Sequence, residues 1–377
     1  MFFRDVIGHN EIKLQLIKSA QNNRISHAQL FLGTEGSGNF QLALAYAQYI
    51  NCENPGATDS CGECPSCVKY RNKQHPDLHF IYPTATGKEI KEKPSSKKLI
   101  KSWVEFLHLK EYFTLNDWMN HIGAGEKLSK INILDSQDIL KTVSLKNFEA
   151  RFKVIIIWCP ENMNIECSNK ILKVLEEPNP KSIFLLVGHS TDALLATIIS
   201  RVQIIKTNRL SDSDVIQGLI NKEGIPESLA QSISLLANGN FSKALELVNS
   251  PESDEQFIDV FQHWMRICYA ADFLKIEKWI NEIDKLGRIA QKNFLEYGLR
   301  IFRECMLYNY VTPSLNRLNK KEEDFNENFA KFIHGGNILE IIDIFESTHN
   351  AIWRNANGKI AFMNLSLNIC NLLKSKP

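Results

Sequence analysis

Residues 30–40 of the chain read L-F-L-G-T-E-G-S-G-N-F, a short apolar run that ends in a glycine-rich loop. We expect the apolar residues to form a strand and the loop to open into a helix over Gln41–Ile50. Glycines allow backbone N–H groups to turn inward, and the first turn of a helix adds a field that favours anions. The stretch therefore predicts the architecture of a phosphate-binding loop, with Gly33, Gly36 and Gly38 placed to face a nucleotide.

Two positions of this loop lack the residues that nucleotide chemistry needs. The spacing of the Walker pattern G-x-x-x-x-G-K-[ST] is met at Gly33 and Gly38. Asn39, however, stands in place of the lysine, and Phe40 in place of the serine or threonine. Without the lysine no cation faces the β- and γ-phosphates, and without the hydroxyl Mg²⁺ loses a protein ligand. We interpret the loop as degenerate, because its architecture is kept and its chemistry is lost.

A second part of the same chemistry is missing after Lys153–Trp158. This segment reads K-V-I-I-I-W, a continuous apolar run typical of a central, buried parallel strand. In a working P-loop ATPase the end of this strand carries acids that hold Mg²⁺ and orient the attacking water. Here Trp158, Cys159 and Pro160 occupy those places, and Glu161 comes one step later. Because both parts are missing together, we expect no ATP hydrolysis by this chain.

Four of the nine cysteines are clustered, with the spacing C-x8-C-x2-C-x2-C at Cys52, Cys61, Cys64 and Cys67. Two-residue gaps let consecutive thiolates turn around one tetrahedral Zn²⁺ ion, and this spacing favours zinc over four buried free thiols. Four cysteine ligands leave no open position, so the predicted zinc is structural. The cluster lacks a strongly basic recognition helix, which favours a staple within the domain over a DNA-binding finger.

Composition limits the function further. The chain has 377 residues, of which 44% are hydrophobic and 23% charged, as in an ordinary globular protein of two or three domains. A net charge of +1 provides no global field to recruit nucleic acid. No apolar run of a signal peptide follows the first residues, and the longest apolar runs have strand length. We therefore expect a cytoplasmic protein with no membrane contact.

Alternating strand and helix patterns up to Ile205 predict an α/β fold, a parallel sheet covered by helices on both faces. Residues 84–130 break the pattern. Their lysine-rich part, residues 88–101, is predicted as a mobile loop, and two helix-patterned stretches follow. We favour helices tucked onto the domain over a docking or DNA-contacting insertion. Beyond a boundary predicted at residues 250–252 every long stretch is helix-patterned, which fits either an oligomerisation collar or a bundle with its own core.

Several segments together resemble the AAA+ clamp-loader family. They are the loop at 33–38, the cysteine insert that follows its helix, N-K-I-L-K-V-L-E-E-P at 169–178 and A-T-I-I-S-R-V at 196–202. The resemblance covers residues 1 to about 250. It implies an AAA+ module over residues 1–208, with a zinc module at 52–67 and an insertion at about 84–130. A small helical lid over 209–250 and an all-α collar for oligomerisation over 251–377 complete the implied organisation.

The resemblance also implies a role for Arg201. The family's S-R-C segment reads Ser200-Arg201-Val202 here, and its arginine reaches the ATP held by a neighbouring subunit. A guanidinium has a permanent charge and a planar fork of donors that suits γ-phosphate oxygens. Such a finger in trans can raise a rate by orders of magnitude. The alternative is an ordinary surface arginine paired with a carboxylate.

The function implied by the resemblance is that of a non-hydrolysing component of the DNA polymerase III holoenzyme. It would help to load a sliding clamp onto primed DNA, with clamp-loader subunits of the gamma/tau and delta types as partners. Two other classes stay open. One is an active P-loop ATPase of the gamma/tau type that uses a displaced lysine, such as Lys170 or Lys173. The other is a stand-alone zinc-bearing DNA-binding module, which the near-zero net charge disfavours.

Overall fold

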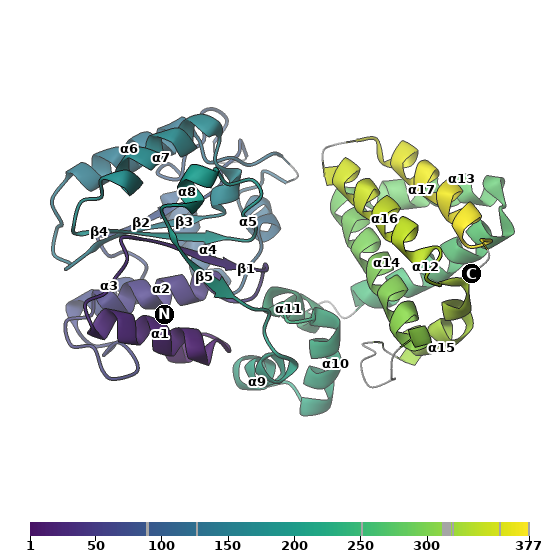
Figure 1. Ribbon diagram of the computed structural model, residues 1–377, viewed down its shortest axis with the longest axis horizontal. Helices are drawn as coiled ribbons and strands as arrows, with labels where there is room; N and C mark the ends of the chain where they lie inside the picture. The colour runs from purple at the N-terminus through teal and green to yellow at the C-terminus, as the bar shows by residue number, and fades with distance from the viewer. Residues whose placement is uncertain are drawn as a thin grey trace. The chain divides into compact units, whose positions relative to one another are not determined.

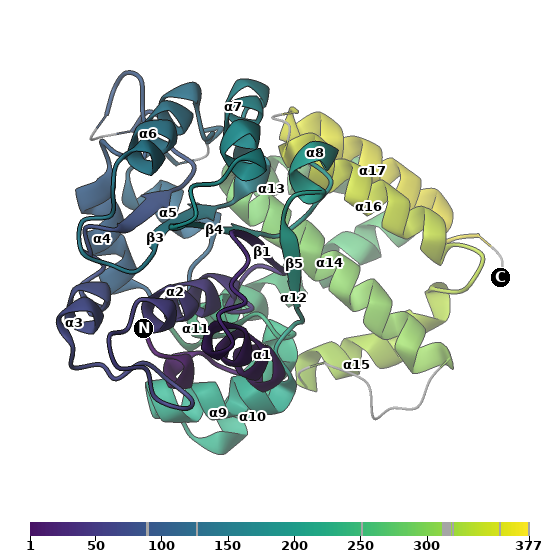
Figure 2. The ribbon, with the colours of Figure 1, turned by 60° about the vertical axis from the view of Figure 1, so that its left-hand side comes forward.

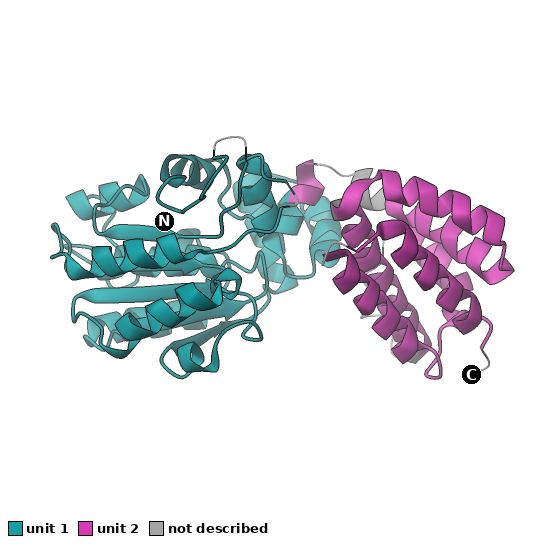
Figure 3. Ribbon diagram, turned by 90° about the horizontal axis from the view of Figure 1, so that it is seen from above, with its two compact units in different colours: residues 1–245 teal, residues 246–377 magenta. Residues whose placement is uncertain are grey.

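The computed structural model describes residues 1–87, 90–125, 127–249, 252–310, 318, 320–353 and 356–375. The chain divides into two compact units, residues 1–245 and 246–377 (Figure 3). The first unit is of the α/β class, whereas the elements described in the second are all helical. Among the described residues, none of the helices is long and apolar enough to span a membrane.

A parallel sheet of five strands organises the first unit, in the order β2-β3-β4-β1-β5. The strands are β1 (Ala28–Gly33), β2 (Leu78–Ile81), β3 (Lys153–Trp158), β4 (Ser182–Gly188) and β5 (Gln203–Thr207). Figure 2 shows part of this order, from β3 through β4 and β1 to β5. Because the strands are parallel, the loops after their carboxyl ends gather at one edge, where such sheets bind ligands.

Helices cover both faces of this sheet, as the alternating pattern predicts (Figure 1). One face carries α1 (Asn10–Gln21), α2 (Asn39–Ile50) and α3 (Pro65–Arg71), and the other carries α6 (Ile133–Ser144), α7 (Ile165–Glu176) and α8 (Ala196–Ile199). The insertion contributes α4 (Ile100–Leu109) and α5 (Leu115–His121), whose apolar residues join the core on the α2 face. Three further helices follow the sheet: α9 (Asp212–Glu223), α10 (Glu227–Ala237) and α11 (Phe241–Asn249).

The continuous apolar run of β3 follows from burial on both sides. Val154, Ile156 and Trp158 pack in the core beneath α2, whereas Ile155 and Ile157 pack in the core beneath α6 and α7. Successive side chains of a strand point to opposite faces, so a strand covered on both faces has no polar side.

The structure differs from the sequence prediction at three places. Helix α2 begins at Asn39 rather than at Gln41, because Gly38 at φ +89° already forms its N-cap. The sequence pattern predicts a helix over Ala193–Ile199, but α8 covers only Ala196–Ile199, since the preceding residues form a turn in which the Leu194 N–H donates to the Thr191 carbonyl. The predicted mobile loop over residues 88–101 is wrong around Ser96, which is buried and exchanges hydrogen bonds with Tyr82. Residues 88 and 89 lie outside the described part.

The second unit contains six described α-helices around its own apolar core. They are α12 (Glu252–Ala270), α13 (Phe273–Lys285), α14 (Gly287–Tyr310), α15 (Lys320–Phe329), α16 (Ile338–Trp353) and α17 (Gly358–Leu372). At its centre the rings of Trp264 and Trp279 stack with centroids 4.8 Å apart. The predicted boundary at 250–252 falls mostly outside the described residues, because Ser250 and Pro251 are not among them. The division into module, lid and collar stays a prediction.

Candidate functional site

The glycine-rich loop connects β1 to α2 at the carboxyl edge of the sheet. Gly33 ends the strand, and Gly36 (φ +70°) and Gly38 (φ +89°) adopt the left-handed conformation that glycine tolerates best. The loop also binds its own chain. The Gly36 carbonyl accepts a hydrogen bond from the Phe241 N–H at 2.9 Å, and Nε2 of His9 lies 2.6 Å from the Ser37 carbonyl oxygen. The predicted loop architecture is therefore present, with helix α11 attached to its tip.

Asn39 supplies no charge to this loop. Its side chain is buried, and Nδ2 lies 3.4 Å from the Gly188 carbonyl oxygen and 3.5 Å from that of Gly33. Its Oδ1 accepts the Phe40 N–H at 3.0 Å. A neutral amide thus holds the loop to the end of β4, in the place where an ATPase would present a lysine to phosphate oxygens.

Phe40 and Trp158, the two positions at which an ATPase would hold Mg²⁺, pack against each other. Their ring centroids are 6.4 Å apart in an edge-to-face arrangement, and both side chains are buried. Neither carries an oxygen that could ligate a metal ion. The sequence showed that each position had lost its ligand, and the structure adds that both belong to one aromatic core.

The insertion completes this core, which sequence reasoning did not foresee. Trp103 from α4 lies 6.0 Å from Phe40 and 5.3 Å from Trp158 between centroids. Phe113, between α4 and α5, lies 5.2 Å from Phe40 and 5.1 Å from Trp158. Trp118 of α5 is fully buried beside Trp103. The signal in the sequence was the aromatic content of residues 103–118, but their spacing cannot reveal which surface they cover.

At the end of β3 and β4, Cys159, Glu161 and His189 form a small polar cluster. The Cys159 sulfur, a Glu161 carboxylate oxygen and His189 Nδ1 lie within 4.8 Å of one another, a combination that could ligate a metal. Nδ1 is nevertheless 3.0 Å from Glu161, which also accepts the His189 N–H. Burial acts to lower the pKa of His189, but the hydrogen bond and charge of Glu161 outweigh it and raise that pKa. Burial also raises the pKa of the Cys159 thiol.

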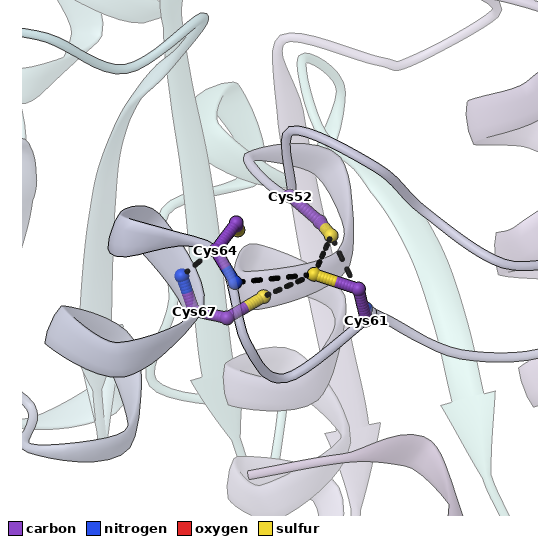
Figure 4. Close-up of side chains that lie close together, drawn as sticks. All are labelled: Cys52, Cys61, Cys64 and Cys67. Atoms are coloured by element: carbon purple, nitrogen blue, oxygen red, sulfur yellow. Dashed lines mark hydrogen bonds between the residues drawn. The ribbon is translucent and has the colours of Figure 1, made fainter.

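The four clustered cysteines converge as the zinc prediction requires (Figure 4). Cys52 follows α2, and Cys64 caps the first turn of α3, which also contains Cys67. The sulfur of Cys61 lies 3.5 Å from that of Cys52 and 3.9 Å from that of Cys67, and all four sulfurs lie within 4.8 Å of one another. None of the nine cysteines forms a disulfide.

These distances fit a tetrahedral ion. Four sulfurs at about 2.3 Å from Zn²⁺ would be about 3.8 Å apart. Backbone N–H groups also point at the sulfurs: Cys61 donates to Cys52, Cys64 to Cys61 and Cys67 to Cys64, at 3.3–3.4 Å. Such donors stabilise the negative charge of thiolate ligands. The residues present could therefore hold one zinc ion, with no position left open for catalysis.

Arg201 follows the short helix α8 and is partly exposed. Its Nη2 lies 2.8 Å from the Glu176 carboxylate, and Nη1 donates to the Thr197 carbonyl at 2.8 Å. Glu176 belongs to the L-E-E-P segment at the end of α7. The side chain is thus held by a surface ion pair, the kind of contact that contributes little to stability and can be exchanged for another anion.

The register of the sheet separates Arg201 from the loop of its own chain. Strand β5 pairs with β1 so that Gln203 lies opposite Gln29 and Thr207 opposite Gly33. Arg201 therefore precedes the amino end of β5, whereas the loop follows the carboxyl end of β1. Lys170 and Lys173 are also separated from the loop, because α7 packs on the face of the sheet opposite α2. No contact found in the described part of the chain joins either lysine to the loop.

Comparison with known proteins agrees with this geometry. The family model described as "DNA polymerase III, delta subunit" matches residues 8–211, more than half of the chain. The DNA polymerase III subunit delta' of Bacillus subtilis is 28% identical over 250 residues, which cover 65% of this chain and 62% of that protein. The subunit tau of the same organism is 25% identical over 393 residues, covering 98% of this chain and 61% of that protein.

The chain thus spans about three fifths of the length of each of these two relatives. Among solved structures, a DNA polymerase III gamma subunit-related protein from Thermotoga maritima aligns over 96% of this chain and 100% of its own, with 14% identity and a TM-score of 0.44. Delta' and tau subunits match alike, so similarity alone does not distinguish them. Together with the parallel sheet, the family match shows that the chain belongs to the DNA polymerase III delta subunit family of AAA+ clamp-loader proteins.

Proposed function

We propose that this chain is a clamp-loader subunit of the delta-prime kind, which helps to load a sliding clamp onto primed DNA without hydrolysing ATP itself. The observation that supports the proposal most is the contact between Phe40 and Trp158. An ATPase needs a metal-binding hydroxyl at the first position and an acid at the second. An active ATPase is the main alternative to this function, because tau and gamma subunits are also among the relatives. The two buried rings favour instead a subunit that performs no chemistry at its own loop.

The catalytic contribution we propose for this chain is made by Arg201 in a neighbouring subunit. Arg201 lies beyond the amino end of β5, away from the loop of its own chain, and its side chain is partly exposed. Its ion pair with Glu176 would have to open when the guanidinium meets a γ-phosphate. A surface pair is weak enough to allow this. The partners would be subunits of the gamma/tau and delta types, the sliding clamp and primed DNA.

The zinc module would serve this function as a structural staple. Zn²⁺ bound by Cys52, Cys61, Cys64 and Cys67 would fix the loop between α2 and α3. The ion would take no part in the reaction, because four protein ligands leave no site for substrate.

Reconstitution with the other clamp-loader subunits tests the finger. Arg201→Ala should lower DNA-stimulated ATP turnover and should reduce clamp loading at least about tenfold, because one ATP site loses its cation in trans. Lys206→Ala is the control, since Lys206 is an exposed cation on the adjacent strand β5. Unchanged turnover and loading with Arg201→Ala would refute the finger role. ATP turnover by the isolated chain would instead favour the active ATPase.

A further inference from the structure

The segment Glu111–Leu115, which joins α4 to α5, lies directly on the degenerate loop. The Leu115 N–H donates to the Glu35 carboxylate at 3.0 Å, and the Gln41 amide donates to the Glu111 carbonyl. A Cβ added at Gly38 would lie only 3.3 Å from Cε1 of Tyr112. The segment therefore covers the first turn of α2, where a phosphate-binding loop would hold its ligand.

Tyr112 links this place to two other parts of the first unit. Its hydroxyl accepts a hydrogen bond from the Ile7 N–H at 2.9 Å. Its ring packs edge-to-face on Phe241, at the start of α11, with centroids 4.8 Å apart. Tyr112 is only 3% exposed. It therefore fills the space between the loop, Ile7 and Phe241 rather than lying on the surface. One side chain thus touches the loop, the N-terminal segment and α11.

Glu111 and Phe113 extend the same contacts on either side. Glu111 forms an ion pair with Lys222 of α9, whose Nζ also lies 5.2 Å from the centroid of the Tyr112 ring. Phe113 points the other way, into the core of Phe40 and Trp158. Glu111 and Tyr112 therefore fill the side of the loop that faces α9 and α11. Phe113 fills the side that faces Phe40 and Trp158, where an ATPase would hold Mg²⁺.

The loop and the following helices also meet directly. The Phe241 N–H donates to the Gly36 carbonyl, and a Cβ built on Gly36 would lie 1.8 Å from Oδ1 of Asn240. A side chain added at Gly36 would displace the Asn240 side chain and would crowd the Ser242 N–H in the first turn of α11, at 3.1 Å. The space next to the loop is thus bounded by residues 7–9, by the loop, and by α9 and α11, with Tyr112 between them.

We propose that Glu111–Leu115 is an internal occupant of the space between the glycine-rich loop and helices α9 and α11, and that it stands where an ATPase would hold its nucleotide. The segment ties the sheet to these helices in one arrangement that needs no ATP or ADP. This inference rests on the proposed function in one respect, since both treat the loop as non-catalytic. It goes further, because it assigns a segment of this chain to the place of the nucleotide and so predicts that the loop binds neither ATP nor ADP.

Nucleotide binding by the isolated full-length chain gives the first test. With Mg²⁺ present, a fluorescent ATP analogue should show no saturable binding. An excess of ATP or ADP should leave hydrogen–deuterium exchange of residues 33–38 and 212–249 unchanged. Saturable binding accompanied by protection of the loop amides would overturn the proposal. No partner subunit is present, so failure of the Arg201 finger would not affect this result.

Variants of Tyr112 test whether the segment holds the helices in place. Tyr112→Ala should speed exchange at least tenfold in peptides that contain Ile7 and Phe241, because both lose a buried contact. Tyr112→Phe keeps the ring and should speed exchange only at Ile7, whose N–H loses its acceptor. Leu109→Ala, at an exposed position of α4, is the control and should change neither peptide.

Hydrogen exchange in the second unit and in the zinc module is the control for global folding. It should stay unchanged in every variant that remains folded. If Tyr112→Ala unfolds the first unit, Tyr112→Phe still decides the question. Unchanged exchange at Ile7 in Tyr112→Phe, or at Phe241 in a folded Tyr112→Ala protein, would overturn the proposal.

Discussion

Phe40 occupies a position at which a working P-loop ATPase has a polar side chain. A hydroxyl at the first turn after a phosphate-binding loop ligates Mg²⁺, and a carboxylate at the end of a neighbouring strand supports it. Phe40 and Trp158 replace both with rings, and Phe80, Trp103 and Phe113 surround Phe40. The Phe40 side chain is part of the core, so its removal should lower the stability of the fold.

We expect Phe40→Ala to lower the free energy of unfolding by about 3–5 kcal/mol, because it opens a cavity in a packed aromatic core. Urea denaturation of the purified chain measures this. Phe148→Ala is the matched control, since Phe148 is 78% exposed, and it should change stability by less than about 0.5 kcal/mol. Equal effects of the two substitutions would contradict the packing described here.

His189 should make stability depend on pH. Its pKa is raised in the folded chain by Glu161, which outweighs the effect of burial. A raised pKa stabilises the fold fully below the unfolded value of about 6.5 and loses that contribution as the pH rises through the folded value. His189→Gln should therefore be most destabilising at acidic pH, with a difference from the parent chain that shrinks above neutrality. Urea titrations at several pH values check this, and a difference that grows with pH would contradict it.

At these positions the sequence shows which residues replace those of an ATPase, but it does not show which of their side chains touch. The motif spacing located Asn39 and Phe40, and the apolar run ending at Trp158 located the second defect. Nothing in the spacing showed that Phe40 and Trp158 touch, because that contact depends on how β3 is placed relative to α2. Similarly, the partner of Arg201 within its own chain, Glu176, is set by the packing of α7 and α8.

Elements of the first unit are joined by a few buried polar anchors, of which Asp77 before β2 is the clearest. Its carboxylate accepts the N–H groups of Phe148, Glu149 and Ala150 at 2.8–2.9 Å. Burial acts to raise the pKa of Asp77, but these hydrogen bonds outweigh it and hold the pKa below its ordinary value of 3.8. The ionised carboxylate therefore fixes the turn that leads into β3.

Asp77→Asn should lower the free energy of unfolding by about 1–3 kcal/mol at neutral pH, since the amide can accept fewer of these bonds. A lowered pKa stabilises the fold above the unfolded value, and the contribution is lost as the pH falls through the folded value. The difference between variant and parent should thus diminish in acid. Asp192→Asn, at an exposed loop position, serves as the control in the same denaturation series.

The cysteine module predicts a measurable metal content. The purified chain should contain about one zinc ion, and Cys64→Ser should lose it together with the stability of α3. Elemental analysis measures the metal, and circular dichroism with and without a chelator measures the structural effect. Cys370→Ser changes a buried cysteine of the second unit and should keep the zinc. A parent chain without stoichiometric zinc would refute the assignment.

The elements of the insertion show where sequence reasoning stops. The apolar stretches around Trp103 and Trp118 predicted two helices, and α4 and α5 confirm them. Amphipathic spacing shows that a helix buries one face, but the partner surface is set by tertiary packing. The lysines of residues 88–101 predict a mobile loop. Ser96 is nevertheless hydrogen-bonded to Tyr82 and to Asp135, both of which lie far from it in the sequence.

At the scale of the whole molecule, the chain consists of two units whose apolar cores share no residue among those described. We expect a fragment of residues 1–249 to fold alone, to keep its zinc and to unfold within a few degrees of the corresponding transition in the full chain. Calorimetry and metal analysis of the fragment check this. A fragment that is unfolded or zinc-free would show that the second unit is required for folding of the first.

The contact between Phe40 and Trp158 has a consequence for how this protein can evolve. A threonine restored at 40 would leave a cavity beside Trp158, and an aspartate restored at 158 would bury its charge among aromatic rings. Each reversion on its own therefore harms the protein, although both would be needed before any benefit appeared. Mutation and selection acting one step at a time cannot easily retrace that path, so the loss of ATP hydrolysis that we propose for this chain would be hard to reverse.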